Sequence, residues 1–570
     1  MAFAQTVLDD GARSGVSTKP AVTLSATELA LAKLTPWWRH QVRKSGLDPA
    51  WEDLAFALQA KQPAPIPELP DGVPFDAAGT DGLAIGQAYV ATVDPAIRSE
   101  HGRHYTPLVL AEQLWKMTRS ALGFGETPEV VPGLVRDPAC GAGALLVPVL
   151  REYLRARSDV DPSIVLAALP QAVEGIDTDP WAVYVANVVL AAEMLPTLAR
   201  AASSLRPLPA LAHVGDGLAA DLEPAQVCIM NPPYGRRKMT DSERARLGGT
   251  VYGHANMYGL FLAAAAKMVG ADGVVSALVP TSFTAGLYFS RLRSYLAEKI
   301  PLHEIAFVKN RSRVFRDVQQ ETCLAVFRAG SPAVRVHSIS DEVAEIASVP
   351  TPTGDRPWLL PRREQDAPLV AAASFLPNTL RSAGWHASTG PLVWNRRRAD
   401  LHSNASKGRA YVLWAADIDG GRVHRDVGRD HIRYLSLHGE KDRAVNALTQ
   451  PAILVQRTTA PEQVRRLVVA PLDADLIATL GGAVVVENHI NVLRPTSDEP
   501  LLTQRLLTRL LSSQMLDDLL RCISGSTAVS SYELGSLPLP SASELDRLAA
   551  VADDDFEAEL ARAYGLPLAF

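Results

Sequence analysis

Short apolar runs and longer helical stretches alternate along the middle of the chain. The apolar runs have the length of buried strands and stop at a glycine, a proline or an acidic residue, which predicts strands that end in loops. Runs of this kind end near residues 137, 177, 214, 230 and 280, and helical stretches lie between them. The alternation predicts an α/β fold over about 100–335, a doubly wound, mostly parallel sheet with helices on both faces.

Two further patterns predict individual elements. The runs 304–308 and 322–327 are apolar and close together, which predicts a hairpin that closes the sheet. Leucines at helical spacing over 501–523 predict a single amphipathic helix packed in a core.

The regions on either side of the α/β stretch differ from it in texture. Residues 1–60 are Ala-rich and predict helices, and we expect Trp37 and Trp38 to pack inside. Five prolines in 63–74 and five in 350–368 predict linkers or extended segments. We therefore divide the chain into a helical N-terminal extension with its linker (1–95), an α/β domain (96–348), a mixed α+β domain (369–540) and an acidic helical tail (541–570).

Composition places the chain among ordinary globular proteins. Its 47% hydrophobic and 21% charged residues are enough for a sizeable core. The sequence offers no apolar run near the ~20 residues of a membrane span and no basic, apolar leader. Its four cysteines are scattered without a Cys-x-x-Cys pair, so we expect neither a zinc site nor disulfides. These features predict a cytoplasmic protein that needs no membrane and no metal.

The net charge of −6 hides a gradient along the chain. Residues 381–470 hold 15 Lys and Arg against 8 Asp and Glu, whereas residues 541–570 hold 2 against 7. A basic block inside an acidic chain indicates an anion-binding face, and an ordinary solvated surface is the alternative.

The stretch Asn231-Pro-Pro-Tyr-Gly follows a buried apolar run. Pro232 and Pro233 lack an N–H and have a fixed φ, so this turn is stiff. It presents one amide and one aromatic ring, Tyr234. Taken alone, the stretch equally fits an ordinary turn at the end of a strand.

Three earlier strand ends carry residues suited to a nucleoside ligand. Gly141 and Gly143 follow the first strand and let backbone approach a ligand closely. Asp177 follows the second, where a carboxylate holds ribose hydroxyls in dinucleotide folds, and Asp179 is the expected helix cap. Asp216 follows the third. Ligands of such sheets bind outside the carboxyl ends of the strands, so we expect these residues to share one crevice with the Asn-Pro-Pro-Tyr turn.

Upstream, Thr106-Pro107 predicts a helix start with threonine as the cap, at a terminus able to receive an anion. Together these motifs resemble the S-adenosylmethionine-dependent DNA adenine-N6 methyltransferases. More narrowly, the chain is similar to the gamma-class, TaqI-like enzymes of type II restriction–modification systems. The order carries the resemblance, which covers about 100–540: His-Tyr-Thr-Pro, then Asp-Pro-Ala-Cys-Gly-Ala-Gly, the two acidic strand ends, Asn-Pro-Pro-Tyr, and a C-terminal basic domain.

The resemblance implies a class I methyltransferase fold over 96–348, a target-recognition domain over 369–540, S-adenosyl-L-methionine as cofactor and double-stranded DNA as partner. It leaves open a cognate restriction endonuclease, and we expect a monomer or weak dimer. The implied cofactor contacts are Tyr105, Thr106, Pro107, Asp137, Pro138, Ala139, Cys140, Gly141, Gly143, Asp177, Asp216 and Gly217. The implied catalytic residues are Asn231, Pro232, Pro233 and Tyr234, and Tyr234 and Phe315 would stack on the target base. From the basic stretches we expect DNA contacts at Arg236, Arg237, Lys238, Arg396, Arg397, Arg398, Arg457, Arg465 and Arg466.

The chemistry of adenine explains why such a turn would be needed. The exocyclic nitrogen is a poor nucleophile, since its lone pair is delocalised into the ring. The Asn231 side-chain oxygen and the Pro232 carbonyl are two preorganised acceptors for its two hydrogens. A base inside a duplex must be flipped out to reach them. The sequence leaves alternatives open: a protein-glutamine or RNA methyltransferase with the same turn, an N4-cytosine enzyme, or an inactive DNA-binding specificity subunit. We find no nuclease motif.

Overall fold

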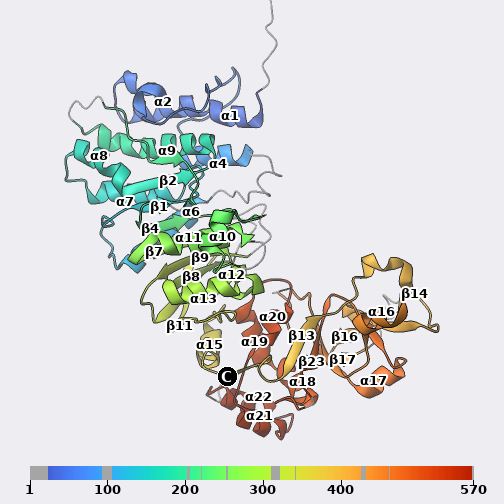
Figure 1. Cartoon of the computed structure of the whole chain (residues 1–570). Helices are drawn as coiled ribbons and strands as arrows, with labels where there is room; N and C mark the ends of the chain where they lie inside the picture. The colour runs from blue at the N-terminus through green and yellow to red at the C-terminus, as the bar shows by residue number, and fades with distance from the viewer. Residues whose placement is uncertain are drawn as a thin grey trace, which may run out of the picture.

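Nine strands form one sheet in the middle of the molecule (Figure 1). The computed structural model describes residues 24–92, 106–201, 206–219, 221–251, 255–309, 321–340, 342–424, 432–460, 462–497 and 499–567. The strands lie in the order β11-β10-β8-β9-β7-β4-β1-β2-β3. Their bounds are β1 Val135–Asp137, β2 Val173–Asp177, β3 Ala212–Val214, β4 Ala225–Met230, β7 Val269–Pro280, β8 Leu302–Val308, β9 Thr322–Arg328, β10 Ala333–Ile339 and β11 Val343–Pro350.

Most neighbouring strands of this sheet run parallel. β3, β2, β1, β4 and β7 are successive parallel neighbours, and β10 runs parallel to β8. β9 is antiparallel to β7 and β8, and β11 is antiparallel to β10. The pairing of Phe307 with Cys323 confirms the predicted hairpin. The predicted doubly wound α/β fold is therefore confirmed, and the carboxyl ends of β1 to β4 meet at one edge.

Helices cover both faces of the sheet, because successive residues of a strand point to opposite sides. On β4, Val227 and Ile229 pack in one core with residues of α6, α7 and α9. Cys228 and Met230 pack in a second core with residues of α11 and α13. The helices of this domain are α6 Leu108–Leu122, α7 Leu146–Ala156, α8 Pro162–Ala172, α9 Pro180–Leu198, α10 Asp241–Leu247, α11 Met257–Met268, α12 Ser282–Ala285 and α13 Ser290–Lys299, and a two-stranded ribbon joins β5 Arg236–Arg237 to β6 Ala255–Asn256.

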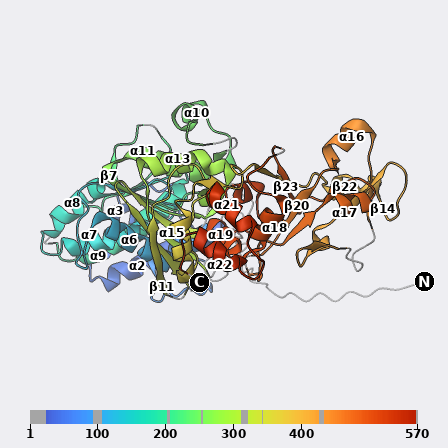
Figure 2. The ribbon, with the colours of Figure 1, turned by 90° about the horizontal axis from the view of Figure 1, so that it is seen from below.

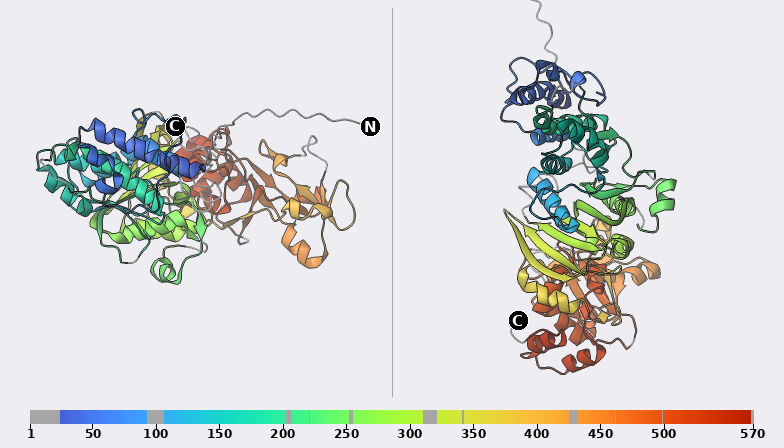
Figure 3. Two further views of the ribbon diagram at one scale, coloured as in Figure 1. Left: turned by 90° about the horizontal axis from the view of Figure 1, so that it is seen from above. Right: turned by 90° about the vertical axis from the view of Figure 1, so that its left-hand side faces the viewer.

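The N-terminal extension is a helical layer on the same core. Its helices are α1 Ala26–Ala32, α2 Leu34–Lys44, α3 Leu54–Ala57 and α4 Gly82–Thr92. α2 and α4 pack against α9, and the N-terminal helices lie above the sheet in Figure 3. Trp37 and Trp38 are fully buried, and their Nε1 atoms each donate a 2.8 Å bond to a backbone carbonyl, which confirms that they pack inside.

α9 is the one helix in the described part of the chain that is long and apolar enough to cross a membrane, so the prediction that no such run exists was wrong. Most of it is buried between the N-terminal helices and the sheet, as in the core helix of a large domain.

Two small sheets, two pairs of short strands (β12-β24 and β16-β17) and a group of helices make up the C-terminal half. The sheets have the orders β13-β23-β20-β21 and β14-β18-β15-β22-β19, and Figure 2 shows β14 and α16 at the end of the molecule farthest from α8. The strands are β12 Asn378–Thr379, β13 Trp385–Thr389, β14 Leu401–His402, β15 Arg409–Leu413, β16 Ile418–Asp419, β17 Arg422–Val423, β18 Tyr434–Ser436, β19 Ala447–Leu448, β20 Ala452–Gln456, β21 Val469–Leu472, β22 Val484–Val486, β23 Ile490–Pro495 and β24 Pro538–Leu539. The helices are α15 Ala367–Ala373, α16 Gly439–Asn446, α17 Ala474–Thr479, α18 Gln504–Ser512, α19 Gln514–Ile523, α20 Ser531–Gly535, α21 Ala542–Ala549 and α22 Phe556–Ala563.

The single helix predicted over 501–523 is wrong: the chain breaks it into α18 and α19. Ser513 has extended backbone (φ −71°, ψ 153°), and its hydroxyl accepts a bond from the Leu516 N–H at 3.2 Å, which caps α19. Both helices still bury their leucines in one core. Leu545 and Leu560 of the acidic C-terminal stretch join that core, so α21 and α22 pack on the domain of residues 369–540.

Candidate active site

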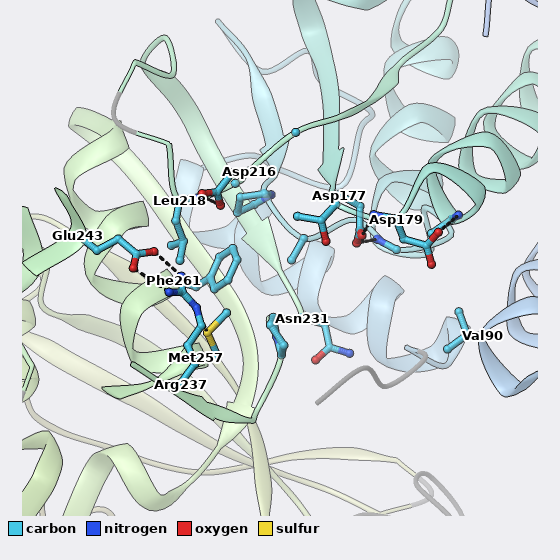
Figure 4. A pocket seen from close by; sticks show the side chains of 18 of the residues that line it. Val90, Asp177, Asp179, Asp216, Leu218, Asn231, Arg237, Glu243, Met257 and Phe261 are labelled. Carbon is cyan, nitrogen blue, oxygen red and sulfur yellow. Dashed lines mark hydrogen bonds and ion pairs between the residues drawn. The ribbon is translucent and has the colours of Figure 1, made fainter. Parts of the chain in front are cut away.

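A cavity of about 580 Å³ lies at the carboxyl ends of β1 to β4 (Figure 4). Loops after these strands form its floor, and α4, α9, α10 and α11 contribute its walls. The lining residues are Tyr89, Val90, Pro138, Ala139, Gly141, Asp177, Thr178, Asp179, Ala182, Gly215, Asp216, Gly217, Leu218, Asn231, Pro233, Arg236, Arg237, Thr240, Glu243, Met257 and Phe261. The topology thus brings the strand ends after β1, β2, β3 and β4 into one crevice.

Glycines allow the loops on the floor to approach one another. Gly141 has φ +50°, and its N–H donates to Asp177 Oδ2 at 2.9 Å. A Cβ at Gly217 would lie 1.8 Å from the Pro138 carbonyl oxygen, so the loops after β1 and β3 touch only because this residue is glycine.

The acidic strand ends are held in place by backbone N–H groups. Asp177 Oδ1 accepts from the Asp179 N–H at 2.9 Å. Asp179 Oδ1 accepts from the Trp181 N–H at 3.0 Å, which confirms Asp179 as the cap of α9. Asp216 Oδ1 accepts from the Leu218 N–H at 2.9 Å. Asp177 and Asp216 therefore face the same cavity with fixed orientations.

Five of the residues expected at the cofactor do not line the cavity. Thr106 and Pro107 precede α6, and the other three belong to β1 and the loop that follows it. Asp137, Cys140 and Gly143 are buried and do not line the cavity. Gly143 is close-packed on Ala186 of α9, and Asp137 Oδ1 accepts from the Ala139 N–H at 3.0 Å. Burial raises the pKa of Asp137 to about 8. Asp137, Cys140 and Gly143 support the loop from the side away from the cavity. The chain turns at Pro138, and only one side of the loop faces the cavity.

Asn231 lies directly after β4, and its amide is fixed at both ends. Its Nδ2 donates to Thr106 Oγ1 at 2.9 Å, and its Oδ1 accepts from the Tyr234 hydroxyl at 3.1 Å. The same hydroxyl lies 3.3 Å from the Leu278 carbonyl oxygen on β7. Thr106 does not cap α6 as predicted: the helix begins at Leu108 without a side-chain cap, since the threonine hydroxyl serves Asn231.

Aromatic rings support the turn from behind. The Tyr234 ring packs edge-on against Tyr258 at 6.1 Å between centroids, and Tyr258 stacks on Phe289 at 5.1 Å. Burial raises the pKa of the Tyr234 hydroxyl well above its ordinary range, so it stays a protonated donor. The buried Pro232 and the half-buried Pro233 complete the turn. Tyr105 and Phe315 lie outside the described residues.

The expected DNA contact Arg237 is part of the cavity wall. Its Nη1 donates to Glu243 Oε2 at 2.8 Å, and its Nε lies 2.8 Å from the Met257 sulfur (Figure 4). Burial alone would raise the pKa of Glu243, but the hydrogen bonds from Arg237 and Thr240 lower it overall. The pairing with Glu243 holds this guanidinium in the cavity wall, so it does not project from an open surface.

The N-terminal extension supplies a wall that the sequence did not predict. Tyr89 and Val90 of α4 line the cavity, and Val90 lies on the side opposite Met257 (Figure 4). The Tyr89 hydroxyl donates to Asp179 Oδ2 at 2.9 Å. α4 is apolar nearly all round and carries no charged residue, so its sequence gives only the signal of a core helix.

The remaining basic residues differ in availability. Lys238, Arg396 and Arg398 are exposed, as expected of a surface that meets an anion, and Arg236 is exposed at the cavity. Arg397 is tied to Asp400 and Asp442 at 2.6 and 2.9 Å. Arg457 and Arg465 are half-buried, and Arg466 is buried.

Comparisons with known proteins agree with this site. The family model described as Eco57I restriction-modification methylase matches residues 225–315, which include the Asn-Pro-Pro-Tyr turn. The type II methyltransferase M.PstI of Providencia stuartii is 25% identical over 57% of this chain and 67% of its own length. M.BsuBI of Bacillus subtilis is 22% identical over the same shares. These matches support a restriction–modification methyltransferase.

A solved structure supports the fold of this chain independently. The type IIL restriction-modification enzyme MmeI, solved in complex with DNA, superposes with a TM-score of 0.50 at 14% identity, over 85% of this chain and 77% of that one. The shared region extends well beyond the nine-stranded sheet, since that sheet and its helices make up less than half of the chain.

Proposed function

We propose that this chain is a site-specific DNA methyltransferase that transfers a methyl group from S-adenosyl-L-methionine to the N6 nitrogen of an adenine flipped out of duplex DNA. The observation that carries the proposal is Asn231, held at the carboxyl end of β4 with its amide nitrogen bound to Thr106 at the edge of the cavity. The gamma class and the TaqI-like order of motifs belong to this proposal.

The residues around the cavity fit S-adenosyl-L-methionine. The volume of the cavity, about 580 Å³, lies in the usual range for small-molecule sites. Asp177 offers carboxylate oxygens at the position where ribose hydroxyls bind in folds of this kind. Leu218, Met257 and Phe261 give an apolar slot for a flat ring, with Asp216 at its rim. The bound cofactor supplies an electrophilic methyl group on a sulfonium.

The turn after β4 would prepare the adenine nitrogen. The Asn231 side-chain oxygen is the acceptor for a hydrogen bond from the base, and the bond from Nδ2 to Thr106 fixes its orientation. A carbonyl oxygen has two lone pairs, so it can accept from the base as well as from Tyr234. The Pro232 carbonyl oxygen accepts a hydrogen bond from the second N–H of the base. Both acceptors are preorganised, and they stabilise the charge that develops on the nitrogen during transfer.

Duplex DNA would approach along the exposed basic residues of the C-terminal half. The exposed Arg396 and Arg398 lie on two short 3-10 helices that precede β14. The guanidinium carbon of Arg398 lies 5.0 Å from the centroid of the Trp394 ring. Phosphate contacts would position the duplex, and a subset of side chains would read base edges. Flipping the target base costs a few kcal/mol, which these contacts must supply.

One experiment tests the proposal against its alternatives. The purified protein is incubated with labelled S-adenosyl-L-methionine and, in separate reactions, duplex DNA, ribosomal RNA or ribosomal protein, and the modified base is then identified by mass spectrometry. We expect N6-methyladenine in DNA, and its loss in Asn231→Ala with an unchanged melting temperature. N4-methylcytosine, or label only in the ribosomal fractions, would reject the adenine assignment, and binding of DNA without transfer would identify a specificity subunit.

A further inference from the structure

A second cavity, of about 200 Å³, lies where the α/β domain meets the C-terminal half. Five basic side chains line it: Lys309, Arg362, Arg363, Arg466 and Arg521. Only two carboxylates, Glu321 and Asp366, line it with them. The expected residues of the methyl-transfer site do not include Lys309, Arg362, Arg363 or Arg521, and the cavity shares no lining residue with the one at Asn231.

Both carboxylates already have cationic partners. Glu321 accepts from Arg362 Nη1 at 3.1 Å and from the Thr281 hydroxyl at 2.9 Å. Asp366 accepts from Arg363 Nη2 at 2.7 Å. A third pair, Arg521 with Asp517, meets at 2.9 Å beside the cavity. Arg363 also pairs with Asp518 at 2.6 Å. Lys309 and Arg466 are therefore the two cations lining the cavity that form no ion pair with a described residue.

Arg466 is a buried cation without a direct counter-ion. It is 1% exposed, and its guanidinium donates only to neutral oxygens: Thr459 Oγ1 and the carbonyls of Ser524 and Ser526. In the described part of the chain, no carboxylate forms an ion pair with it, and burial lowers the pKa of the group. The carboxylates of Glu533 and Asp517 attract Arg466 from a distance but form no ion pair with its guanidinium. Buried charges in proteins are normally paired, so an anion in the adjoining cavity would supply a direct partner.

A second donor at this cavity is also unsatisfied. The Arg362 guanidinium lies 3.5 Å above the Phe307 ring, and its Nε is buried with no hydrogen-bond partner among the described residues. Lys309 follows the last residue of β8, is exposed, and forms no side-chain bond to any described residue. Unpaired donors of this kind are the groups that bind phosphate oxygens.

The cavity lies at the same edge of the sheet as Asn231. β8 and β4 point in the same direction, so Lys309 after β8 and Asn231 after β4 both leave the carboxyl edge. β9 and β7 lie between β8 and β4. At ~4.8 Å per strand, the axes of β8 and β4 are therefore about 14 Å apart across the sheet. At a rise of ~3.4 Å per nucleotide, this distance spans about four positions of a DNA strand.

We propose that this cavity binds one phosphodiester of the DNA backbone, within about four nucleotides of the flipped adenine, through Lys309 and Arg362 above the buried charge of Arg466. The inference rests on the proposed function, because it takes DNA as the substrate. Phosphate contacts fix the register of a protein on the duplex without reading sequence. The site therefore positions the target nucleotide opposite the Asn231 turn.

The test compares Lys309→Ala with Lys299→Ala. Lys299 ends α13 just before the opposite end of β8, so it is a matched lysine that lies away from the cavity. Binding is measured over about 50 to 200 mM salt, with S-adenosylhomocysteine present, to duplexes that contain the mapped methylation site. For Lys309→Ala we expect a loss of about three- to tenfold in affinity, equal for specific and unrelated duplexes, and a salt slope smaller by about one. Lys299→Ala should match the wild type.

A second series of duplexes locates the phosphate. Each carries one uncharged methylphosphonate, placed in turn within about four nucleotides on either side of the adenine. One position should weaken wild-type binding but leave Lys309→Ala unaffected, since the partner charge is already gone. Equal sensitivity of both proteins at every position overturns the inference. Arg362→Gln should show the same insensitivity, and its melting temperature reports whether it folds.

Failure of the proposed function gives a different result. If the wild type transfers no methyl group to DNA, the melting temperature is measured in inorganic phosphate and in chloride at equal ionic strength. A phosphate-dependent rise in melting temperature, lost in Lys309→Ala, with no effect of any methylphosphonate, identifies a free-anion site and overturns the DNA assignment. Normal methyl transfer with unchanged DNA binding in Lys309→Ala overturns the inference alone.

Discussion

The side chains of Asn231 and Thr106 are joined by a hydrogen bond of 2.9 Å, although 125 residues separate them in the sequence. The bond holds the amide nitrogen and so fixes the direction in which the Asn231 oxygen, which also accepts from Tyr234, presents its lone pairs. It also links the turn after β4 to the segment that begins α6.

Replacing Thr106 should therefore slow methyl transfer more than it weakens cofactor binding. In Thr106→Val the amide of Asn231 loses its orienting partner, and we expect kcat to fall about fivefold, since one hydrogen bond contributes about 1 kcal/mol. Single-turnover transfer rates and S-adenosylhomocysteine affinity measure the two effects. Thr106→Ser keeps the hydroxyl and should retain most of the rate. A Val variant with the wild-type rate would show that the bond does not orient the amide for catalysis.

Arg237 and Lys238 are neighbours that should behave differently. Arg237→Gln removes the pairing with Glu243 and loosens the cavity wall, so we expect weaker S-adenosylhomocysteine binding and an unchanged salt slope for DNA. Lys238 is exposed outside the cavity, and Lys238→Gln should leave cofactor affinity unchanged. Calorimetric titration with the cofactor product and salt-dependent DNA binding separate the two. Reversed effects would return Arg237 to the DNA surface.

Tyr89 should connect the N-terminal extension to cofactor binding. Tyr89→Phe removes only the hydroxyl that donates to Asp179, next to the carboxylate of Asp177. We expect the Kd for S-adenosylhomocysteine to rise about threefold, as for one hydrogen bond of modest net strength. The loss should be smaller for an analogue without ribose hydroxyls, because the effect passes through Asp177. Tyr153→Phe, on α7 and away from the cavity, is the control.

Asp137 should give the protein a stability that declines as the pH rises. Its folded pKa of about 8 exceeds the ~3.9 of an unfolded aspartate, so between these values the folded state holds a proton that the unfolded state has lost. Raising the pH in this window should reduce the free energy of unfolding by about 1.4 kcal/mol per unit, with the decline ending above about pH 8. Asp137→Asn lacks this term. Melting temperatures of both proteins from about pH 6 to about pH 9 should diverge, and parallel curves would contradict the pKa.

Local sequence patterns determined much of this protein. The alternation of apolar runs with helical stretches predicted the doubly wound sheet, and strand ends at Asp177, Asp216 and Asn231 fell in one cavity because parallel strands share a carboxyl edge. The cap at Asp179 and the buried Trp37 and Trp38 were also predictable, since each depends on residues a few positions away or on composition alone.

Only the tertiary structure decided which side chains meet across that edge. Three sets of hydrogen bonds join segments far apart in the chain. They run from Asn231 to Thr106, from Tyr89 to Asp179, and from Arg466 to the carbonyls of Ser524 and Ser526. Helical and strand periodicities report which face of one element is buried, but they do not report what packs against that face. Arg237 likewise had the sequence of a surface arginine but lies in the cavity wall, where it pairs with Glu243 of α10.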